Sequence, residues 1–581
     1  MASINTKDFV EAIEKVKHQK FRAGDFIYLY KVFTRRPEPQ DLFKQYTSNG
    51  KNVTALDLLY FLKHEQQEIN ADECTALSII NSHNPVMKCK LKRKLMTYNG
   101  FLRYITSTDC SIFNQDHAKV YQRMDLPMTT YFIASSQDTF TSNQFIGQSD
   151  MNGYISALKK GCRCLELDCR DGPENEPRVY HGFALISMIL VKDVIEVINM
   201  YAFETSEYPL ILSLEINCKP IQQHVIANHL VNILEDKLIT MNDMDDNLTQ
   251  LSSPEELKGK ILIKCKNAQM FSSKVFGMWH LADGEVRKFN PEAESEIMNV
   301  EPAEIRPLRM KEKRKVGLAM EFSNVLVYAK PVEFKDFKHS WNSQLFLESN
   351  SFSEHSAMKL VKQSACEFVA HNSKFLSRIY SVGIRRNHSN YKPHNFWNVG
   401  CHMVTLNYGI PGLGMDLNRG KFQDNGGCGY VLKPHFMTDG SKFYPLASKH
   451  TFDPIIAFIQ IISGHHLPVC RPQSKISSDP CVQVEIYGVP TDSTIQQTKA
   501  LPSAGCHPRW NDCLVFCVQV PELALVRFTV KDTNPSNENN FLGQYTLPFT
   551  SMRKGYRVVP LLNPDGLSLS PAILFVYVWY A

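Results

Sequence analysis

Two acidic residues stand two positions apart inside an apolar stretch of the chain. They are Glu166 and Asp168, within the run 162–169, which otherwise consists mostly of Cys and Leu. Because residues two apart on a β-strand point to the same face, the two carboxylates are expected on one side of a strand. Leaving them unpaired there costs several kcal/mol, so they need a cation. A hard metal ion is one candidate, and an Arg or Lys side chain is the other.

Two further residues could act as a metal ligand, an acid or a base. Glu215 ends the apolar run 210–215, and carboxylates at strand ends of a βα array lie where barrel active sites form. An exposed strand-end carboxylate is the alternative interpretation. His181 stands between Tyr180 and Gly182, and its imidazole could exchange a proton near neutral pH. A buried or turn histidine is the alternative there.

Cationic residues end two other strand-like runs. Lys264 and Lys266 alternate at the end of 261–266, and Arg378 and Tyr380 alternate in 375–380. On a strand, this alternation places each pair on one face. The pattern agrees with an anion site, and a solvated strand end fits it equally well.

The chain divides into four regions with different patterns of apolar and polar residues, and these regions must position the residues named above. Residues 1–115 show helical periodicity, for example at Phe9, Ala12, Ile13 and Val16. From 125 to 267 and again from 316 to 435, short apolar runs alternate with amphipathic stretches, which predicts βα units and a parallel sheet. The polar segment 268–315 between them reads as a linker with a basic run at its end. Residues 451–581 hold several short strand-like runs, which predict a β-sandwich.

Composition narrows the class of protein. The chain has 581 residues, 43% of them hydrophobic, and a net charge of +5, which indicates several globular domains and gives no reason to expect nucleic acid. The 16 Cys show no dense spacing, and the N-terminus lacks an apolar signal segment. No apolar run reaches the roughly 18 residues that a membrane span needs. We therefore expect a cytoplasmic protein with free thiols and, at most, peripheral contact with a membrane.

Several longer strings point to a known family. They are Lys160-Gly161-Cys162-Arg163-Cys164-Leu165-Glu166-Leu167-Asp168-Cys169, Tyr180-His181-Gly182, the stretch 208–215 and the stretch 422–434. Together they resemble the phosphoinositide-specific phospholipase C family, most closely its delta and zeta branches. The resemblance covers nearly the whole chain.

The resemblance implies a multidomain architecture and a reaction. The expected order is a truncated helical EF-hand-like region at 1–115, the X half of a split TIM-type (β/α)8 barrel at 125–267, a linker at 268–315, the Y half at 316–435 and a C2-type β-sandwich at 451–581. The expected reaction is the calcium-dependent cleavage of phosphatidylinositol 4,5-bisphosphate to inositol trisphosphate and diacylglycerol. The resemblance also implies phosphoinositide lipids and a peripheral membrane surface as partners, whereas it leaves protein partners unknown.

The resemblance also assigns roles to single residues. His181 matches the histidine that protonates the departing diacylglycerol oxygen, and Tyr380 matches the residue that packs on the inositol ring. The residues that match holders of the ring phosphates are Lys264, Lys266, Ser351 and Arg378. The residues that match ligands of Ca²⁺ are Asp138, Glu166, Asp168 and Glu215.

The pattern departs from the family at two adjacent positions. Where the family reads Ser-Ser-His-Asn-Thr-Tyr, this chain reads Ser-Ser-Gln-Asp-Thr-Phe over 135–140. Gln137 replaces the first catalytic histidine, and a neutral amide cannot offer the positive charge of an imidazolium to the phosphorane. Losing one preorganised donor of this kind costs roughly 10²–10³ in rate. Asp138 replaces the asparagine ligand, which leaves a formal charge of −2 on a calcium site with four ionised carboxylates, where the family's residue would leave −1.

These departures favour one of two hypotheses. The first is a pseudoenzyme that keeps the architecture, calcium and headgroup binding but has lost efficient turnover. The second is an active but impaired phospholipase C. The flanking modules are weakened too, because the loop 46–52 has no carboxylate for an EF-hand and the sandwich has Asn534 where an Asp is common. The basic run of the linker could attract an anionic membrane.

Overall fold

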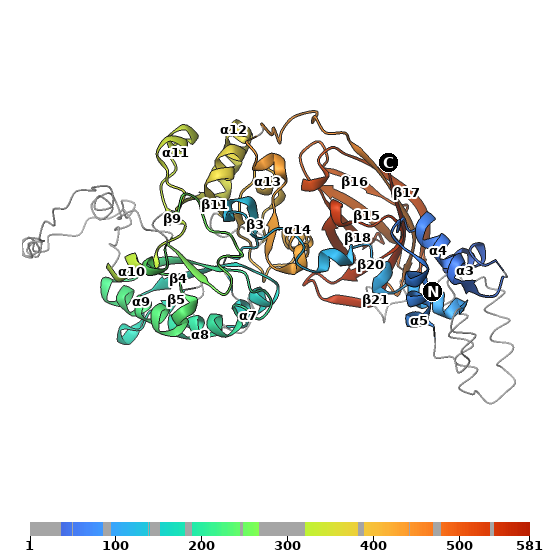
Figure 1. The fold of residues 1–581 in the computed structure, drawn as a ribbon, viewed down its shortest axis with the longest axis horizontal. Helices are drawn as coiled ribbons and strands as arrows, with labels where there is room; N and C mark the ends of the chain where they lie inside the picture. The colour runs from blue at the N-terminus through green and yellow to red at the C-terminus, as the bar shows by residue number, and fades with distance from the viewer. Residues whose placement is uncertain are drawn as a thin grey trace, which may run out of the picture.

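The computed structural model describes residues 37–48, 50–84, 95–137, 139, 151–180, 189–244, 248–265, 320–381, 389–440, 442–468, 478–534 and 540–581. Three units follow one another along the long axis of the molecule. The C-terminal sandwich lies between the barrel and the N-terminal helices (Figure 1). No helix within these ranges is long and apolar enough to cross a bilayer, and each cysteine within them is a free thiol.

Eight strands from two separate stretches of chain form the barrel. The first stretch contributes β3 (Tyr131–Ile133), β4 (Cys164–Arg170), β7 (Leu210–Asn217) and β8 (Ile261–Cys265). The second contributes β9 (Lys330–Pro331), β10 (Glu348–Ser353), β11 (Leu376–Tyr380) and β12 (Met403–Val404).

Parallel pairing runs around the barrel and joins the two stretches. Strand β4 pairs with β7 and β7 with β8, while β9, β10, β11 and β12 pair in that order. Met403 of β12 pairs with Ile133 of β3, and Ser135, just beyond β3, bridges to Cys164 of β4. The split TIM-type barrel that the sequence predicts is thereby confirmed. Short antiparallel strands flank it, namely β5 (Arg178–Val179), β6 (Ile189–Leu190) and β13 (Tyr430–Leu432).

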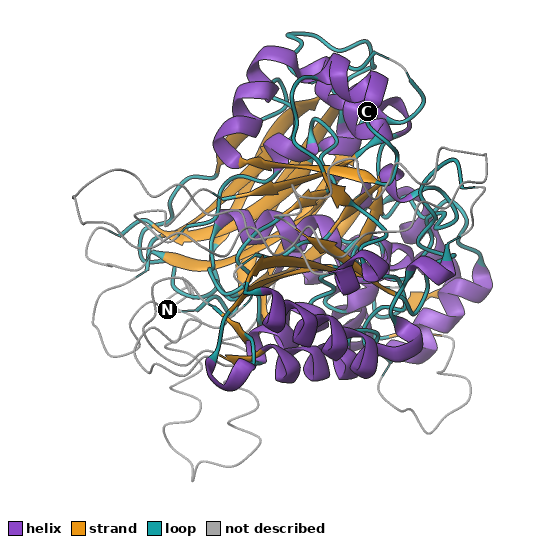
Figure 2. Ribbon diagram, turned by 90° about the vertical axis from the view of Figure 1, so that its left-hand side faces the viewer, coloured by secondary structure: helices purple, strands orange, loops and turns teal. Residues whose placement is uncertain are grey.

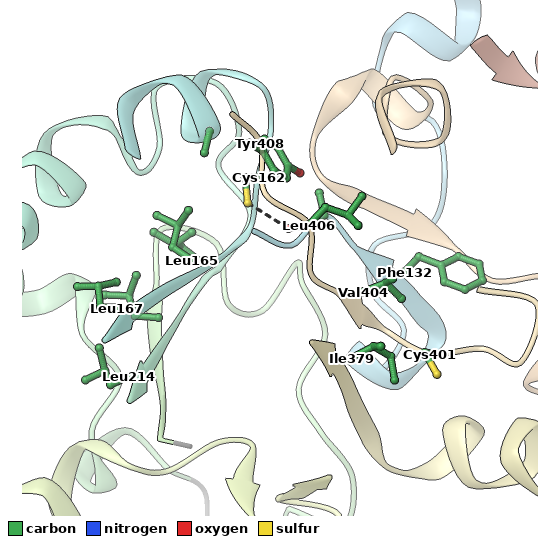
Figure 3. Close-up of a cluster of buried hydrophobic side chains, with 14 of the residues drawn as sticks. Phe132, Cys162, Leu165, Leu167, Leu214, Ile379, Cys401, Val404, Leu406 and Tyr408 are labelled. Carbon is green, nitrogen blue, oxygen red and sulfur yellow. Dashed lines mark hydrogen bonds between the residues drawn. The ribbon is translucent and has the colours of Figure 1, made fainter. Parts of the chain in front are cut away.

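Helices cover the outside of the barrel. Viewed from the barrel end, they lie above and below the strands (Figure 2). They are α7 (Asn152–Lys159), α8 (Val191–Tyr201), α9 (Pro220–Leu234), α10 (Met320–Val325), α11 (Phe337–Ser343), α12 (Glu354–Lys374), α13 (His394–Trp397) and α14 (Leu413–Phe422). Leu165, Leu167 and Leu214 point away from the barrel interior into the core under these helices (Figure 3). The intervening residues of β4 and β7 therefore face inward.

One of the short apolar runs of the second stretch is not a strand. The run 325–328 has the composition that predicts one, but helix α10 ends at Val325 and the strand is β9 at Lys330–Pro331. The run is buried throughout. A short, fully buried apolar run has no hydrophobic periodicity that could distinguish a helix end from a strand.

The sandwich is an eight-stranded antiparallel sheet that curves on itself. Its neighbours follow the order β16, β15, β18, β19, β20, β21, β14 and β17. The strands are β14 (Ile455–His465), β15 (Pro480–Tyr487), β16 (Thr494–Gln497), β17 (Arg509–Val518), β18 (Leu525–Asp532), β19 (Phe541–Pro548), β20 (Gly555–Leu562) and β21 (Ser568–Tyr580). The alternating burial along β17 shows why the sequence forms a strand with one face in the core.

Within the described residues, four helices at the amino-terminal side pack on the sandwich. They are α3 (Pro37–Gln45), α4 (Ala55–His64), α5 (Glu73–His83) and α6 (Tyr98–Ile105), with the short antiparallel pair β1 (Val53–Thr54) and β2 (Leu95–Met96) between them. Thr54 and Asp57 form a capping box that starts α4. Gln66 exchanges two hydrogen bonds with the backbone of Tyr556, which fixes the helices to β20.

A buried ion triad joins the barrel to the sandwich. Arg527 of β18 donates to Asp416 of α14 at 2.9 Å and to Glu485 of β15 at 2.6 Å. All three side chains are buried. Because the guanidinium neutralises carboxylates of both units, the triad ties the orientation of the barrel to that of the sandwich.

We expect Arg527→Ala to destabilise the protein by about 3–5 kcal/mol, because it leaves the buried Glu485 without its cation and Asp416 with only Arg419, 3.9 Å away. Arg123→Ala is the matched control, since Arg123 pairs with Asp125 at the surface and both side chains are more than half exposed. The midpoint temperature of thermal unfolding should fall strongly in Arg527→Ala, whereas it should hardly change in Arg123→Ala. Equal shifts would mean that the triad contributes no more than a surface pair.

Candidate functional site

The interior of the barrel is layered along its strands. The layer nearest the amino ends is apolar, and its side chains form one buried cluster. From adjacent strands this cluster includes Ile133, Cys164, Ile211, Leu262, Leu376 and Met403. Strand register places three of these residues at the same level, with Cys164 beside Ile211 and Ile211 beside Leu262, whereas Met403 is the register partner of Arg378 and of Ile133. The next inward-facing level is polar, because side chains on a strand alternate between faces.

A charged layer lies directly above the apolar one. Register places Glu166 beside Ser213, Ser213 beside Lys264, and Ser351 beside Arg378. Two contacts cross the interior. The Lys264 ammonium donates to Ser351 Oγ at 3.1 Å, and Arg378 Nη2 lies 2.8 Å from Glu166 Oε2. Residues from both stretches of chain therefore meet in one cluster.

The charges of this layer do not cancel. Lys264 and Arg378 are almost completely buried, and the carboxylate of this layer is that of Glu166, while the charge of Glu215 also acts on Arg378 from the level above. Burial, and then the charge of Arg378, lowers the pKa of Lys264 to about 8. Arg378 Nε and Nη1 and the Ser213 hydroxyl are also buried, and they have no hydrogen-bond partner among the described residues. Excess positive charge and unused donors together favour an anion.

Acidic residues occupy the level above, toward the carboxyl ends of the strands. Asp168 and Glu215 are register partners on β4 and β7, so their side chains share the inward face. Burial raises the pKa of Asp168, and the nearby charge of Glu215 adds to this shift. The ring of Tyr380 lies at the same end of β11, 5.7 Å from the Arg378 guanidinium.

Arginines accompany two of the carboxylates that were matched to calcium ligands. Glu166 pairs with Arg378, and Asp168 accepts from Arg170 at 3.2 Å and from Asn217 at 2.9 Å. The Arg170 guanidinium also lies over the Tyr180 ring at 3.8 Å. This arrangement corresponds to the alternative that the sequence left open, in which arginine satisfies the acidic pair. The signal in the sequence was the arginine at position 170, where the resembled family usually has tryptophan.

The donor set is still chemically suited to a hard cation. Glu166, Asp168 and Glu215 supply carboxylate oxygens from the same face of two adjacent strands. Among the described residues, however, no group of three or more His, Cys, Asp or Glu gathers closely enough to bind a metal ion by themselves. The fourth predicted ligand, Asp138, lies outside the described residues, as do His181 and Lys266.

Gln137 lies on the chain that leaves β3 and is 6% exposed. Its Oε1 accepts from the Ser381 amide at 3.0 Å and lies 2.8 Å from the Thr405 hydroxyl, while its Nε2 donates to the Ser381 hydroxyl. The carboxamide therefore connects the ends of β3, β11 and β12. Sequence reasoning missed these partners, because they lie more than 240 residues away.

The loop of the sandwich that could have bound calcium is internally bonded. Asp532 accepts from the Ser478 hydroxyl at 2.8 Å, from the Asp479 amide at 2.9 Å and from the Asn534 amide at 3.0 Å. Its carboxylate is almost completely buried. Asp532 thus holds two loops of the sandwich together.

A (β/α)8 barrel with charged layers toward the carboxyl ends of its strands, joined to a curved antiparallel sandwich, defines a multidomain protein with a candidate anion site. Family models match four segments of the chain. They are the X domain of phosphatidylinositol-specific phospholipase C at 124–267, its Y domain at 322–436, the EF-hand-like region of phosphoinositide-specific phospholipase C at 29–115 and the C2 domain at 456–561.

Similar proteins cover nearly the whole chain. Human 1-phosphatidylinositol 4,5-bisphosphate phosphodiesterase zeta-1 is 41% identical over 99% of this chain and 94% of its own length. The bovine delta-4 phosphodiesterase is 42% identical over 95% of this chain and 74% of its own length. The crystal structure of S. officinalis PLC21 superposes with a TM-score of 0.78 at 28% identity, covering 100% of this chain and 74% of that one. The chain belongs to the phosphoinositide-specific phospholipase C family, and it is of the zeta and delta type.

We expect Gln137→Ala to destabilise the barrel by about 1–3 kcal/mol, because it leaves the Ser381 amide without its acceptor. Gln115→Ala is a suitable control, since Gln115 is exposed and donates one hydrogen bond, to the Phe113 carbonyl. Thermal unfolding of the two variants would test the difference. If both variants unfolded at the temperature of the unchanged protein, the hydrogen bonds of Gln137 would contribute nothing to the stability of the barrel.

Proposed function

We propose that this protein binds phosphoinositide headgroups at the mouth of its barrel, together with calcium, and hydrolyses them slowly or not at all. The observation that carries the proposal is the position of Gln137. By the resemblance of 135–140 to the family's string, this residue would occupy the place of the first catalytic histidine, and its amide is engaged by Ser381 and Thr405. Family membership supplies the substrate class, and the relatives are named as phosphodiesterases of 1-phosphatidylinositol 4,5-bisphosphate.

The charged layer supports headgroup binding. Lys264 and Arg378 would neutralise ring phosphates, and Ser351, hydrogen-bonded to Lys264, would add a donor. The unused N–H groups of Arg378 suit an oxyanion. Tyr380, at the end of the same strand, would pack on the inositol ring, and Lys266 would extend the cationic side of the site beyond the described residues.

Calcium would be held by Asp138, Glu166, Asp168 and Glu215, the oxygen-rich set suited to a hard cation. When bound, calcium supplies neutralisation of charge on the phosphate and a lower pKa for the attacking hydroxyl. Arg170 and Arg378 compete for two of these carboxylates. The extra charge of Asp138 would favour the metal, whereas it would repel the anionic headgroup.

The chain's own groups account for slow turnover. In the family's reaction, the inositol 2-hydroxyl gives up its proton and attacks the phosphorus, the bond to the diacylglycerol oxygen breaks, and that oxygen takes a proton; water then opens the cyclic phosphodiester. His181 would supply this proton as general acid. Charge on the pentavalent phosphorus would lack the imidazolium of the family, because Gln137 is neutral and its Nε2 already donates to the Ser381 hydroxyl. We also propose that the protein is cytoplasmic and meets the lipid at the membrane surface.

We expect the purified protein to release inositol phosphate from phosphatidylinositol 4,5-bisphosphate vesicles with calcium at least about 10²–10³-fold more slowly than human zeta-1, because one preorganised donor is missing. Restoring the family residues with Gln137→His and Asp138→Asn is expected to recover part of this rate. Turnover comparable to that of the human relative would instead support the second hypothesis, an active phospholipase C. If the double variant stayed inert, other changes in the loop would be responsible.

We expect Lys264→Met with Arg378→Met to weaken the binding of inositol trisphosphate at least tenfold, because hydrogen bonds to charged groups contribute about 1.5–3 kcal/mol each. Methionine keeps most of the buried volume and removes the charge. Lys260→Ala is the control, since Lys260 is on the same chain segment but bonds to the Asp236 carbonyl outside the barrel. Titration calorimetry that finds the same affinity in all three proteins would rule out this headgroup site.

A further inference from the structure

A cavity of about 330 Å³ lies where the N-terminal helices meet the sandwich. Its walls come from the turn 66–68 that follows α4, from the segment 550–554 that leads into β20, and from the end of β21. None of the described residues that line it belongs to the barrel. We call this space the junction cavity, and it is separate from the candidate site inside the barrel.

Positive charge predominates in the wall of the junction cavity. Three cationic residues line it, namely Arg553, Lys554 and Arg557, and Glu68 is the only acidic residue among the described residues of the wall. Both guanidiniums share one oxygen of this carboxylate. Glu68 Oε1 lies 2.6 Å from Arg553 Nη2 and 3.4 Å from Arg557 Nη1. Three cations and one carboxylate leave a formal charge of +2 on the cavity.

The other contacts of the two arginines do not neutralise this charge. Arg557 is 1% exposed, and burial, followed by the charge of Arg553, lowers its pKa. Its remaining hydrogen bonds go to two main-chain carbonyls, at 2.7 and 2.9 Å. Arg553 likewise donates to the main-chain carbonyl of Asp109 at 2.6 Å, whereas the Asp109 carboxylate lies 2.7 Å from His83. Neutral carbonyls satisfy N–H groups without compensating the charge.

Lys554 contributes a cation without a carboxylate. Its ammonium lies 4.5 Å from the centre of the Tyr580 ring and 5.3 Å from that of the Trp579 ring. These rings stabilise the ammonium by cation–π attraction but accept no proton from it. In the part of the chain that the structure describes, no acidic side chain pairs with Lys554. Its N–H donors are therefore available to a ligand in the junction cavity.

The charge and the donors together indicate the chemistry of the ligand. A phosphate monoester carries about −1.5 to −2 charge at neutral pH and three strong acceptor oxygens. This matches a cavity of charge +2 that offers guanidinium and ammonium donors. A carboxylate would bring a single negative charge and leave part of the excess uncompensated.

We infer that the junction cavity is a second anion site, which binds a phosphate monoester group against Arg553, Lys554 and Arg557. A free phosphate ester and a lipid headgroup can present the same group, so the shared chemistry is the phosphate itself. Because Glu68 follows α4 and the three cations belong to the sandwich, a bound phosphate would complete a charged contact between the two units.

Lys554 reports on the cavity through the reactivity of its own amine. The full chain is acetylated with succinimidyl acetate in phosphate or in chloride of the same pH and ionic strength, and mass spectrometry follows each lysine. We expect phosphate to slow Lys554 by a factor of one plus the ratio of phosphate concentration to Kd. Lys531 is the internal control, because it is half-buried like Lys554 and bonds to Gln483 outside the cavity. Its rate should be equal in both buffers.

Arg553→Met tests the site itself. It removes one guanidinium, while Arg557 remains as the partner of Glu68 and keeps the junction formed. We expect the Kd obtained from Lys554 protection to rise at least about tenfold, because a charge-assisted hydrogen bond to the phosphate is lost. Arg123→Met is the matched control, since Arg123 pairs with Asp125 at the surface away from the cavity, and it should leave Kd unchanged.

Two vesicle preparations separate the sources of the phosphate. Phosphatidylcholine vesicles with phosphatidic acid present the monoester on a lipid, and phosphatidylcholine alone presents none. Protection by free phosphate and by neither vesicle would assign a soluble ester, whereas protection by phosphatidic acid at a lower phosphate concentration would assign a lipid headgroup. Equal Lys554 rates under all conditions would overturn the inference. So would an unchanged Kd in Arg553→Met, or protection by phosphatidylcholine alone, because the exposed Trp579 ring would then be the contact.

Discussion

The ion pair between Glu166 and Arg378 makes it possible for the barrel to hold charge in its interior. Arg378 is completely buried, and an isolated buried guanidinium would cost far more than any packing gain around it. Glu166 comes from the X half and Arg378 from the Y half, so the pair also joins the two halves across the interior. Lys264 and Ser351 complete the layer, and the apolar cluster below keeps water from reaching it through the amino ends of the strands.

A second constraint comes from the chain after β3. Gln137 connects the ends of β3, β11 and β12 through Ser381 and Thr405. An amide offers both an acceptor and a donor without charge, so it can bridge these groups at little electrostatic cost. The same neutrality makes it a poor substitute for an imidazolium beside a phosphorane. The residue that would reduce turnover is thus suited to a structural role at its position.

Strand periodicity made much of the site predictable. Because side chains alternate with a period of two, Glu166, Asp168, Lys264 and Arg378 could be assigned to one face from sequence alone. These side chains meet in one layer because of the register between strands that are far apart in the sequence. The local pattern of residues does not specify that register. The partners of Gln137 and the pairing of Arg170 with Asp168 depend on tertiary contacts in the same way. Strand β9 was misplaced, because the buried apolar run 325–328 that precedes it shows no alternation between buried and exposed residues.

The pairing of the charged layer also bears on how the proposed ligands would bind. Glu166 is a proposed calcium ligand, and its present partner Arg378 is a proposed phosphate ligand. A cation that binds Glu166 weakens the ion pair between Glu166 and Arg378. The guanidinium of Arg378 is then more available to an anion. An anion at Arg378 frees Glu166 for a cation by the same exchange. Coupling of this kind is reciprocal, so calcium and headgroup would each raise the affinity for the other. This coupling needs no catalytic histidine, so a protein that has lost turnover could still sense both ligands together.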